Sequence, residues 1–191
     1  MTGRAAKRGG GRKVRLGLVL GLGFLLNALR LSGQAIEEYQ FKAAFLFNLA
    51  KFVEWPPQAF QTPSDPIVSC LAGESPLGAA LQRGAADNSI GARKLVVKPV
   101  SDPRQLAGCH ILFVSSSLHK RWHALVDATR GTGILTVGET DDFATGGGIV
   151  NFRLEGERIR VQINVAAAER EHLRISSRLL SLPQIVKVQS P

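Results

Sequence analysis

Several sequence signatures of well-known activities are missing from this chain. It has no Gly-x-Ser-x-Gly motif, which excludes the nucleophile elbow of serine hydrolases. No Gly-Lys-Ser/Thr follows the glycine run at residues 146–148, and this run precedes a predicted strand rather than a helix. Because phosphate loops need their glycines where a strand turns into a helix, a tight turn is the favoured interpretation. The sequence also shows no internal repeat, low-complexity tract or second domain.

Only one long hydrophobic run is present, and it lies within the first 35 residues. Six of the first 15 residues are Lys or Arg, the run covers Leu16–Leu29, and Gly33 and Ala35 are small residues of the kind that signal peptidase requires. We therefore predict a secretory signal peptide, residues 1–35, that is cleaved after Ala35. An uncleaved membrane anchor is the alternative, but this run is short against the roughly 20 residues that span a bilayer. Because no second run approaches that length, we expect the cleaved chain not to span a membrane.

Negative charge is absent from the same 35 residues, which hold seven of the 24 basic residues. Residues 36–191 then carry 17 basic and 15 acidic residues, a net charge of +2. Nucleic-acid binding requires a basic patch on the folded domain, so we expect no nucleic-acid partner.

Cysteine is scarce, since Cys70 and Cys109 are the only two in the chain. In an oxidising compartment their pairing would close a 40-residue loop. In the chain-entropy model that closure stabilises the fold by about 4 kcal/mol. The alternative is two separate buried thiols, because a sequence does not give the separation of their Cα atoms. The 156 residues that follow the predicted cleavage site are enough for one domain with a substantial core.

The order of helical and strand patterns predicts an α/β fold. Short apolar runs, typical of strands buried on both faces, alternate with helices, which favours a mainly parallel sheet covered on both sides. Two alternating runs around Glu155-Gly156-Glu157 predict an antiparallel hairpin. We expect a single domain, residues 36–191, built as a three-layer α/β/α sandwich with a mainly parallel mixed sheet and this C-terminal antiparallel hairpin. The expected helices are 37–55, 76–83, 117–130 and 166–182, and the expected strands are 67–72, 93–100, 110–115, 133–137, 150–154 and 159–163.

The first predicted helix carries two residues that do not fit its amphipathic pattern. Its apolar residues form two adjacent rows, but Phe47 falls on the far side, with Gln40 and Lys51. An exposed aromatic ring can anchor a protein interface. The alternative is that a loop or the C-terminal helix covers this ring. Lys42 is the opposite case, since it lies within the apolar arc, and Glu38 one turn earlier is its expected partner.

Candidate catalytic and metal-binding residues are few. Ser115–Ser117 follow a predicted strand, where open α/β sheets often bind ligands, and His119 is the only nearby base. Helix capping by Ser116 or Ser117 is the favoured interpretation, and small-ligand binding at this strand edge stays open. His119 and His123 lie four residues apart on a predicted helix, but the glutamate of a metalloprotease motif is missing. We therefore predict no metal site and no catalytic residue.

The stretch from Glu38 to Pro57 is the most distinctive in the chain. It reads EYQFKAAFLFNLAKFVEWPP, a helical pattern that ends in a tryptophan and two prolines. It resembles the mature start of the YfiR-like family, and further similar segments follow in order. They lie at residues 71–73, 109–114, 147–149, 163–164 and 175–180, so the resemblance covers nearly the whole predicted mature chain.

The resemblance implies a periplasmic protein without catalytic activity or cofactor. It further implies repression of a membrane-bound diguanylate cyclase, with lower cyclic di-GMP and an effect on biofilm formation. The expected partner is the periplasmic region of that cyclase, and a second copy of this chain is a further candidate. The amphipathic patterns suggest a hypothesis for the surface that contacts the partner. We expect it to include Phe47 and Lys51 on the first helix, together with Arg178, Leu179 and Leu180. The alternative is a periplasmic sensor that binds a small ligand near residues 115–117.

Overall fold

The computed structural model describes residues 36–86, 88–156 and 158–189. The predicted signal peptide, residues 1–35, lies outside this described part. The chain divides after Glu38 into two compact units, and the second, residues 39–191, contains every strand formed by the described residues.

The first helix is shorter than predicted. Residues 36–49 are helical, and one 3₁₀ turn, η1 (Ala50–Phe52), follows them. The predicted helix end at residue 55 is wrong, because Val53–Glu54 form the short strand β1. This strand pairs antiparallel with β9 (Arg174–Ile175), so its backbone finds hydrogen bonds outside the helix. A second 3₁₀ turn, η2 (Pro57–Ala59), comes next.

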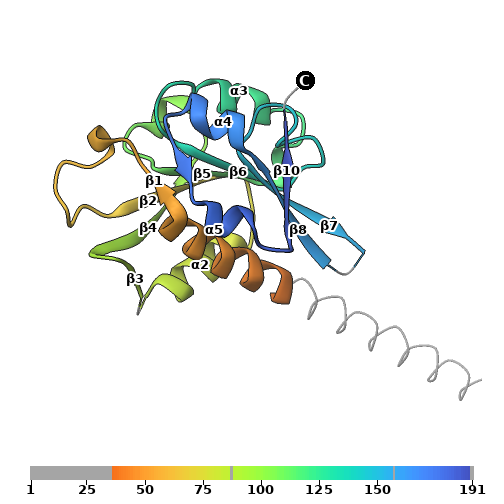
Figure 1. The fold of residues 1–191 in the computed structure, drawn as a ribbon, viewed down its shortest axis with the longest axis horizontal. Coiled ribbons are helices and arrows are strands. Elements are labelled where there is room, and N and C mark those ends of the chain that lie inside the picture. The colour runs from red at the N-terminus through yellow and green to blue at the C-terminus, as the bar shows by residue number, and fades with distance from the viewer. Residues whose placement is uncertain (1–35, 87, 157, 190–191) are drawn as a thin grey trace, which may run out of the picture. The chain divides into compact units, whose positions relative to one another are not determined.

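The main sheet has eight strands among the described residues, in the order β10-β8-β7-β6-β5-β2-β4-β3. Strands β2, β4, β5, β6 and β7 run parallel, and β7 and β8 form the predicted antiparallel hairpin. The mainly parallel mixed sheet is therefore confirmed (Figure 1). The bounds are β2 (Ile67–Ala72), β3 (Ser89–Ile90), β4 (Arg93–Val100), β5 (Ile111–Val114), β6 (Leu135–Gly138), β7 (Val150–Glu155), β8 (Arg158–Asn164) and β10 (Ile185–Val188).

Short helices connect these strands. The predicted helix 117–130 is broken into a 3₁₀ turn and a six-residue helix, α3. The predicted helix 76–83 is confirmed as α2, although it continues past Gly84. The bounds are α2 (Leu77–Ala85), η3 (Pro103–Leu106), η4 (Ser116–Leu118), α3 (Trp122–Asp127), α4 (Val165–Arg170) and α5 (Ser177–Leu180).

The prediction of one C-terminal helix over residues 166–182 is wrong. Helix α4 ends at Arg170, and His172 has a φ of 58°, a left-handed conformation that an α-helix cannot contain. The chain then forms β9, which pairs with β1, and the separate helix α5. Strand β10, which the sequence did not indicate, pairs parallel with β8 at the edge of the main sheet.

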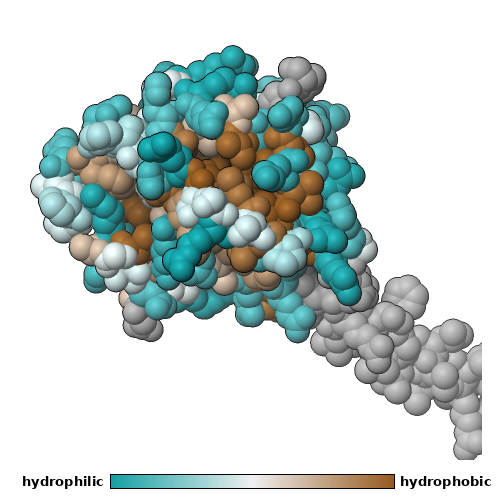
Figure 2. Space-filling view, viewed as in Figure 1, coloured by the Kyte–Doolittle hydropathy of each residue, from teal (hydrophilic) through white to brown (hydrophobic). Residues whose placement is uncertain are grey.

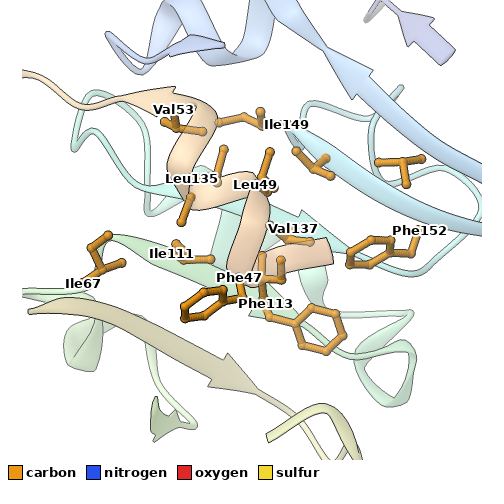
Figure 3. Packing of buried hydrophobic residues seen from close by; sticks show 14 of the residues in the cluster. Phe47, Leu49, Val53, Ile67, Ile111, Phe113, Leu135, Val137, Ile149 and Phe152 are labelled. Atoms are coloured by element: carbon orange, nitrogen blue, oxygen red, sulfur yellow. The ribbon is translucent and has the colours of Figure 1, made fainter. Parts of the chain in front are cut away.

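Two hydrophobic cores cover the two faces of the main sheet. Alternate residues of a strand enter different cores, as the two-residue period of a strand requires. In β5, Ile111 and Phe113 belong to the first core, and Leu112 and Val114 belong to the second. Helix residues including Leu49 pack over the first core (Figure 3), together with α2, α4 and α5, whereas α3 packs on the second. The three-layer α/β/α arrangement is therefore confirmed.

The predicted disulfide is present in the second core. Cys70 of β2 and Cys109, two residues before β5, are bonded, with their Cα atoms 5.8 Å apart. Both cysteines are buried. The bond joins β2 to the residues that lead into β5, the strand with which β2 pairs parallel.

Candidate functional site

The part of the first helix that belongs to the α/β unit, here called helix 39–49, lies between α2 and α5 on one face of the main sheet (Figure 1). A groove runs along each flank of this helix. The groove beside α2, here called the polar groove, has a volume of about 540 Å³. The groove beside α5, here called the apolar groove, has a volume of about 260 Å³. Ala44 and Asn48 line both grooves, so they form the ridge between them.

The polar groove combines two cations with amide side chains. Lys51 and Arg83 line it from opposite sides, and no carboxylate is found among the described residues that line it. The Lys51 ammonium lies 3.0 Å from Asn48 Oδ1 and 5.0 Å from the centroid of the Phe47 ring. The lining residues are Gln40, Ala43, Ala44, Phe47, Asn48, Lys51, Ala80, Arg83, Gly84 and Asn88.

The apolar groove is lined mainly by aromatic and leucine side chains. Phe41 stacks on Phe45 with their ring centroids 6.1 Å apart, and Leu182 and Gln184 form part of the opposite wall. On this face of the molecule, hydrophobic residues gather around α5 and the neighbouring strands β8 and β10 (Figure 2). The lining residues are Phe41, Ala44, Phe45, Asn48, Leu49, Phe52, Leu179, Leu182 and Gln184.

The prediction that Phe47 projects from the helix as an exposed ring is wrong. Phe47 is 8% exposed and belongs to the first core, whereas Phe41, which lies in one of the two apolar rows predicted to pack in the core, is 41% exposed. The pattern of a single helix assumes one buried face, on the sheet. Because α2 also packs on one flank, the buried arc is turned toward Phe47 and away from Phe41. The expected cover by a loop or the C-terminal helix is replaced by α2.

The structure places the residues expected to contact a partner on both flanks of helix 39–49. Lys51 is exposed in the polar groove. Leu179 is buried in the wall of the apolar groove, Leu180 is half-buried, and Arg178 is exposed beside them on α5. These residues therefore border the same helix, although they are far apart in the sequence. Their role in binding stays a prediction.

A buried ion pair fixes helix 39–49 to the carboxyl ends of two parallel strands. The Lys42 ammonium lies 2.7 Å from Glu139 Oε2, and Glu139 directly follows β6. The other carboxylate oxygen accepts hydrogen bonds from the Ser116 backbone N–H at 3.0 Å and the Ser116 hydroxyl at 3.1 Å. It also accepts a longer bond, 3.4 Å, from the Tyr39 hydroxyl. Glu139 thus joins the helix, the end of β6 and the residues that follow β5.

Sequence reasoning missed Glu139 altogether. The available signals were a lysine inside an apolar arc and an acidic residue just beyond a buried strand. The expected pairing of Lys42 with Glu38 stays a prediction, since Glu38 belongs to the other unit of the chain.

All three serine hydroxyls after β5 are engaged within the protein. The Ser115 hydroxyl donates to the Glu74 carbonyl at 2.6 Å, and Ser117 Oγ accepts from the Glu74 N–H at 3.1 Å. The Ser116 hydroxyl donates to Glu139 rather than to a histidine. Ser115, not Ser116 or Ser117, caps the following 3₁₀ turn. A ligand at this strand edge would therefore have to replace contacts that hold the loops together.

The glycine run and His123 have ordinary structural roles, and His119 is exposed. The Gly146 and Gly148 N–H groups donate to the carbonyls of Asp142 and Phe143, which is the predicted tight turn. The His123 ring stacks on Trp122, with centroids 3.6 Å apart. Among the described residues, no three His, Cys, Asp or Glu side chains lie close enough together to hold a metal ion.

Fold and grooves together define an α/β protein that presents one helix, bordered by two grooves, at its surface. The family model described as YfiR/HmsC-like matches residues 39–184, and the chain belongs to this family. The family is one of periplasmic regulators of diguanylate cyclase signalling and is regulatory rather than catalytic. No curated protein matches the chain. In the described part of the chain, every helix is too short or too polar to cross a membrane.

Proposed function

We propose that this protein acts in the periplasm as a repressor of a membrane diguanylate cyclase, and that it lowers cyclic di-GMP. Membership of the YfiR/HmsC-like family supports this proposal. The predicted signal peptide supplies the route to the periplasm. The protein acts by binding the periplasmic region of the cyclase, with no reaction of its own.

One observation carries the proposed binding surface, namely the exposure of apolar side chains along helix 39–49. Phe41 is a large aromatic residue on an amphipathic helix, and 41% of its surface is open to solvent. Leu182, in the opposite wall of the apolar groove, is 37% exposed. Clusters of exposed aromatic and aliphatic residues with a polar rim are typical of protein interfaces. The polar groove, with Lys51 and Arg83, supplies such a rim.

Repression requires more than tight binding to the cyclase. A ligand shifts a two-state equilibrium only by the difference between its affinities for the two states. To move a cyclase from 1% to 99% inactive, the repressor must bind the inactive arrangement about 10⁴-fold more tightly than the active one. The proposed surface must therefore recognise a shape that the periplasmic region of the cyclase adopts only in the inactive state.

Deletion of the gene tests the proposed function in the cell. Loss of the repressor should raise cyclic di-GMP and biofilm formation, and the full-length chain should restore both. A chain that lacks residues 1–35 and stays in the cytoplasm should fail to restore them, because the proposed contact is periplasmic. Unchanged cyclic di-GMP after deletion would remove the regulatory proposal.

A further inference from the structure

The side chain of His110 bridges two segments of backbone. Its Nδ1 accepts a hydrogen bond from the N–H of Val68, near the start of β2, at 3.1 Å. Its Nε2 lies 2.9 Å from the carbonyl oxygen of Ala59, the last residue of η2. A backbone N–H can only donate and a carbonyl can only accept, so Nε2 carries the proton and Nδ1 carries none. The structure therefore requires a neutral His110 with one defined tautomer.

The same imidazole is stacked on the segment that it holds. The Phe60 ring lies almost parallel to it, with centroids 4.4 Å apart and 7° between the planes. The Arg93 guanidinium also lies over the Phe60 ring, 3.6 Å from its centroid. Arg93 donates to the carbonyls of Thr62 and Asp65 at 2.9 and 2.8 Å. Residues 57–66 are thus attached through His110, Phe60 and Arg93.

Protonation of His110 at Nδ1 is incompatible with the present position of the ring beside Val68, although the Nε2–H bond to the Ala59 carbonyl would itself tolerate the proton. A proton on Nδ1 would point at the Val68 N–H, so a hydrogen bond would become a contact between two donors. The new positive charge would also lie in a half-buried position near the Arg93 cation. Among the described residues, the Asp65 carboxylate is the charged group near the ring that would favour it.

We propose that His110 is an acid-sensitive latch: protonation at Nδ1 forces the ring away from the Val68 N–H, its contacts with Ala59 and Phe60 are lost with it, and residues 57–66 are released from strands β2 and β5. The segment that His110 holds, residues 57–66, follows helix 39–49 and β1 in the chain. The Trp55 ring contacts Phe60 of this segment edge-on, with centroids 6.0 Å apart. Acidification of the surrounding compartment therefore loosens the chain directly after the helix that borders the two grooves. The latch is a property of the isolated protein and stands independently of the proposed cyclase partner.

The pKa of His110 sets the direction of the pH effect and the pH range in which it occurs. Burial lowers the pKa of His110 below its ordinary value of 6.5, and the Arg93 charge lowers it further, against the opposing effects of the Ala59 carbonyl and Asp65. The attached state thus favours neutral His110, whereas the released state lets it protonate with an ordinary pKa. The attachment is fully present above pH 6.5 and weakens as the pH falls toward the lowered pKa. Within this window the ratio of released to attached segment rises by at most about tenfold per pH unit, because one proton is bound on release.

Asp65 does not titrate in the same window. Hydrogen bonds from the Thr62 hydroxyl and the backbone N–H groups of Thr62 and Gln61 lower the pKa of this carboxyl group below its ordinary 3.8. It therefore stays ionised at pH 5, and a change between pH 7.5 and pH 5 reports on His110.

Amide hydrogen exchange of the exported protein tests the latch. Exchange of residues 57–68 is measured at pH 7.5 and pH 5.0 and corrected for the intrinsic effect of pH on exchange. The wild type should show a larger opening constant at pH 5.0 than at pH 7.5. His110→Asn keeps an acceptor near Val68 but cannot be protonated, so its opening constant should be raised at both pH values and no longer depend on pH. His119→Asn, which alters an exposed histidine, should behave like the wild type.

A direct titration covers the case in which His110→Asn fails to fold. The imidazole proton signals of the wild-type protein, followed by NMR, should show His110 titrating below pH 6.5 together with shifts of the Val68 and Ala59 amide signals. Exchange of residues 57–68 that is unchanged at pH 5.0, or a His110 that titrates without affecting these amides, would overturn the proposal.

Discussion

Lys42 and Glu139 form a buried ion pair across 97 residues of sequence, with 2.7 Å between Nζ and Oε2 and side chains only 6% and 3% exposed. Lys42→Met should destabilise the fold by about 3–5 kcal/mol, because it leaves the Glu139 carboxylate buried beside no cation. The free energy of unfolding, from denaturant titration, measures the effect.

An exposed ion pair serves as the matched control. Arg130 and Asp127 are also 2.7 Å apart, but their side chains are 78% and 60% exposed. Arg130→Met should change the free energy of unfolding by less than about 1 kcal/mol. Adding Glu139→Gln to Lys42→Met should recover part of the lost stability, since the uncompensated charge is then gone. A loss below 1 kcal/mol for Lys42→Met would contradict the role given to the pair.

The Cys70–Cys109 disulfide should account for a large share of the stability. It links residues 39 positions apart and lies in the second core. Replacing both cysteines by Ala should lower the free energy of unfolding by about 2–5 kcal/mol. If the double variant and the wild type unfold at the same denaturant concentration, the bond has no such role.

Two glycines should respond in opposite ways to a methyl group. A Cβ on Gly148 would overlap the Phe143 ring, which is fully buried, so Gly148→Ala should destabilise the protein by about 1–3 kcal/mol. Gly84 lies within α2 and has open space at its Cβ position. Gly84→Ala should therefore stabilise by about 0.5–1 kcal/mol, because glycine weakens a helix interior. Thermal unfolding of both variants checks the signs, and equal effects would contradict the packing around Phe143.

The sequence predicted best what depends on local pattern. Strands 67–72 and 93–100 have the predicted bounds, because short apolar runs between turn residues define them. The hairpin follows from alternation around Gly156. The C-terminal region could not be predicted in this way. The predicted helix 166–182 is interrupted there by the left-handed backbone at His172 and by the pairing of β9 with β1. Strand β1 lies more than 100 residues earlier in the chain.

In the candidate site, too, local pattern predicts some features, whereas contacts between distant segments decide others. The amphipathic pattern identified helix 39–49 as a packed helix, but the contact with α2 decides that Phe47 is buried and Phe41 is exposed. The pairing of Lys42 with Glu139 depends on how the end of β6 meets the helix. Spacing along the chain carries no information on such contacts.

Binding of the cyclase by the ridge of helix 39–49 can be tested with two matched substitutions. Ala44 is exposed and lines both grooves, so Ala44→Glu places a charge at the centre of the proposed surface. Ala124 is also an exposed helical alanine, but it lies on α3, over the second core. Ala124→Glu therefore introduces the same change on the opposite face of the sheet.

The most direct measurement is capture of diguanylate cyclase activity from a membrane extract by the immobilised mature protein. The wild type and Ala124→Glu should capture equal cyclase activity, measured after release, and Ala44→Glu should capture at least tenfold less while unfolding at the same temperature as the wild type. Capture that is equal for all three proteins, or no cyclase activity captured by the wild type, would contradict the account.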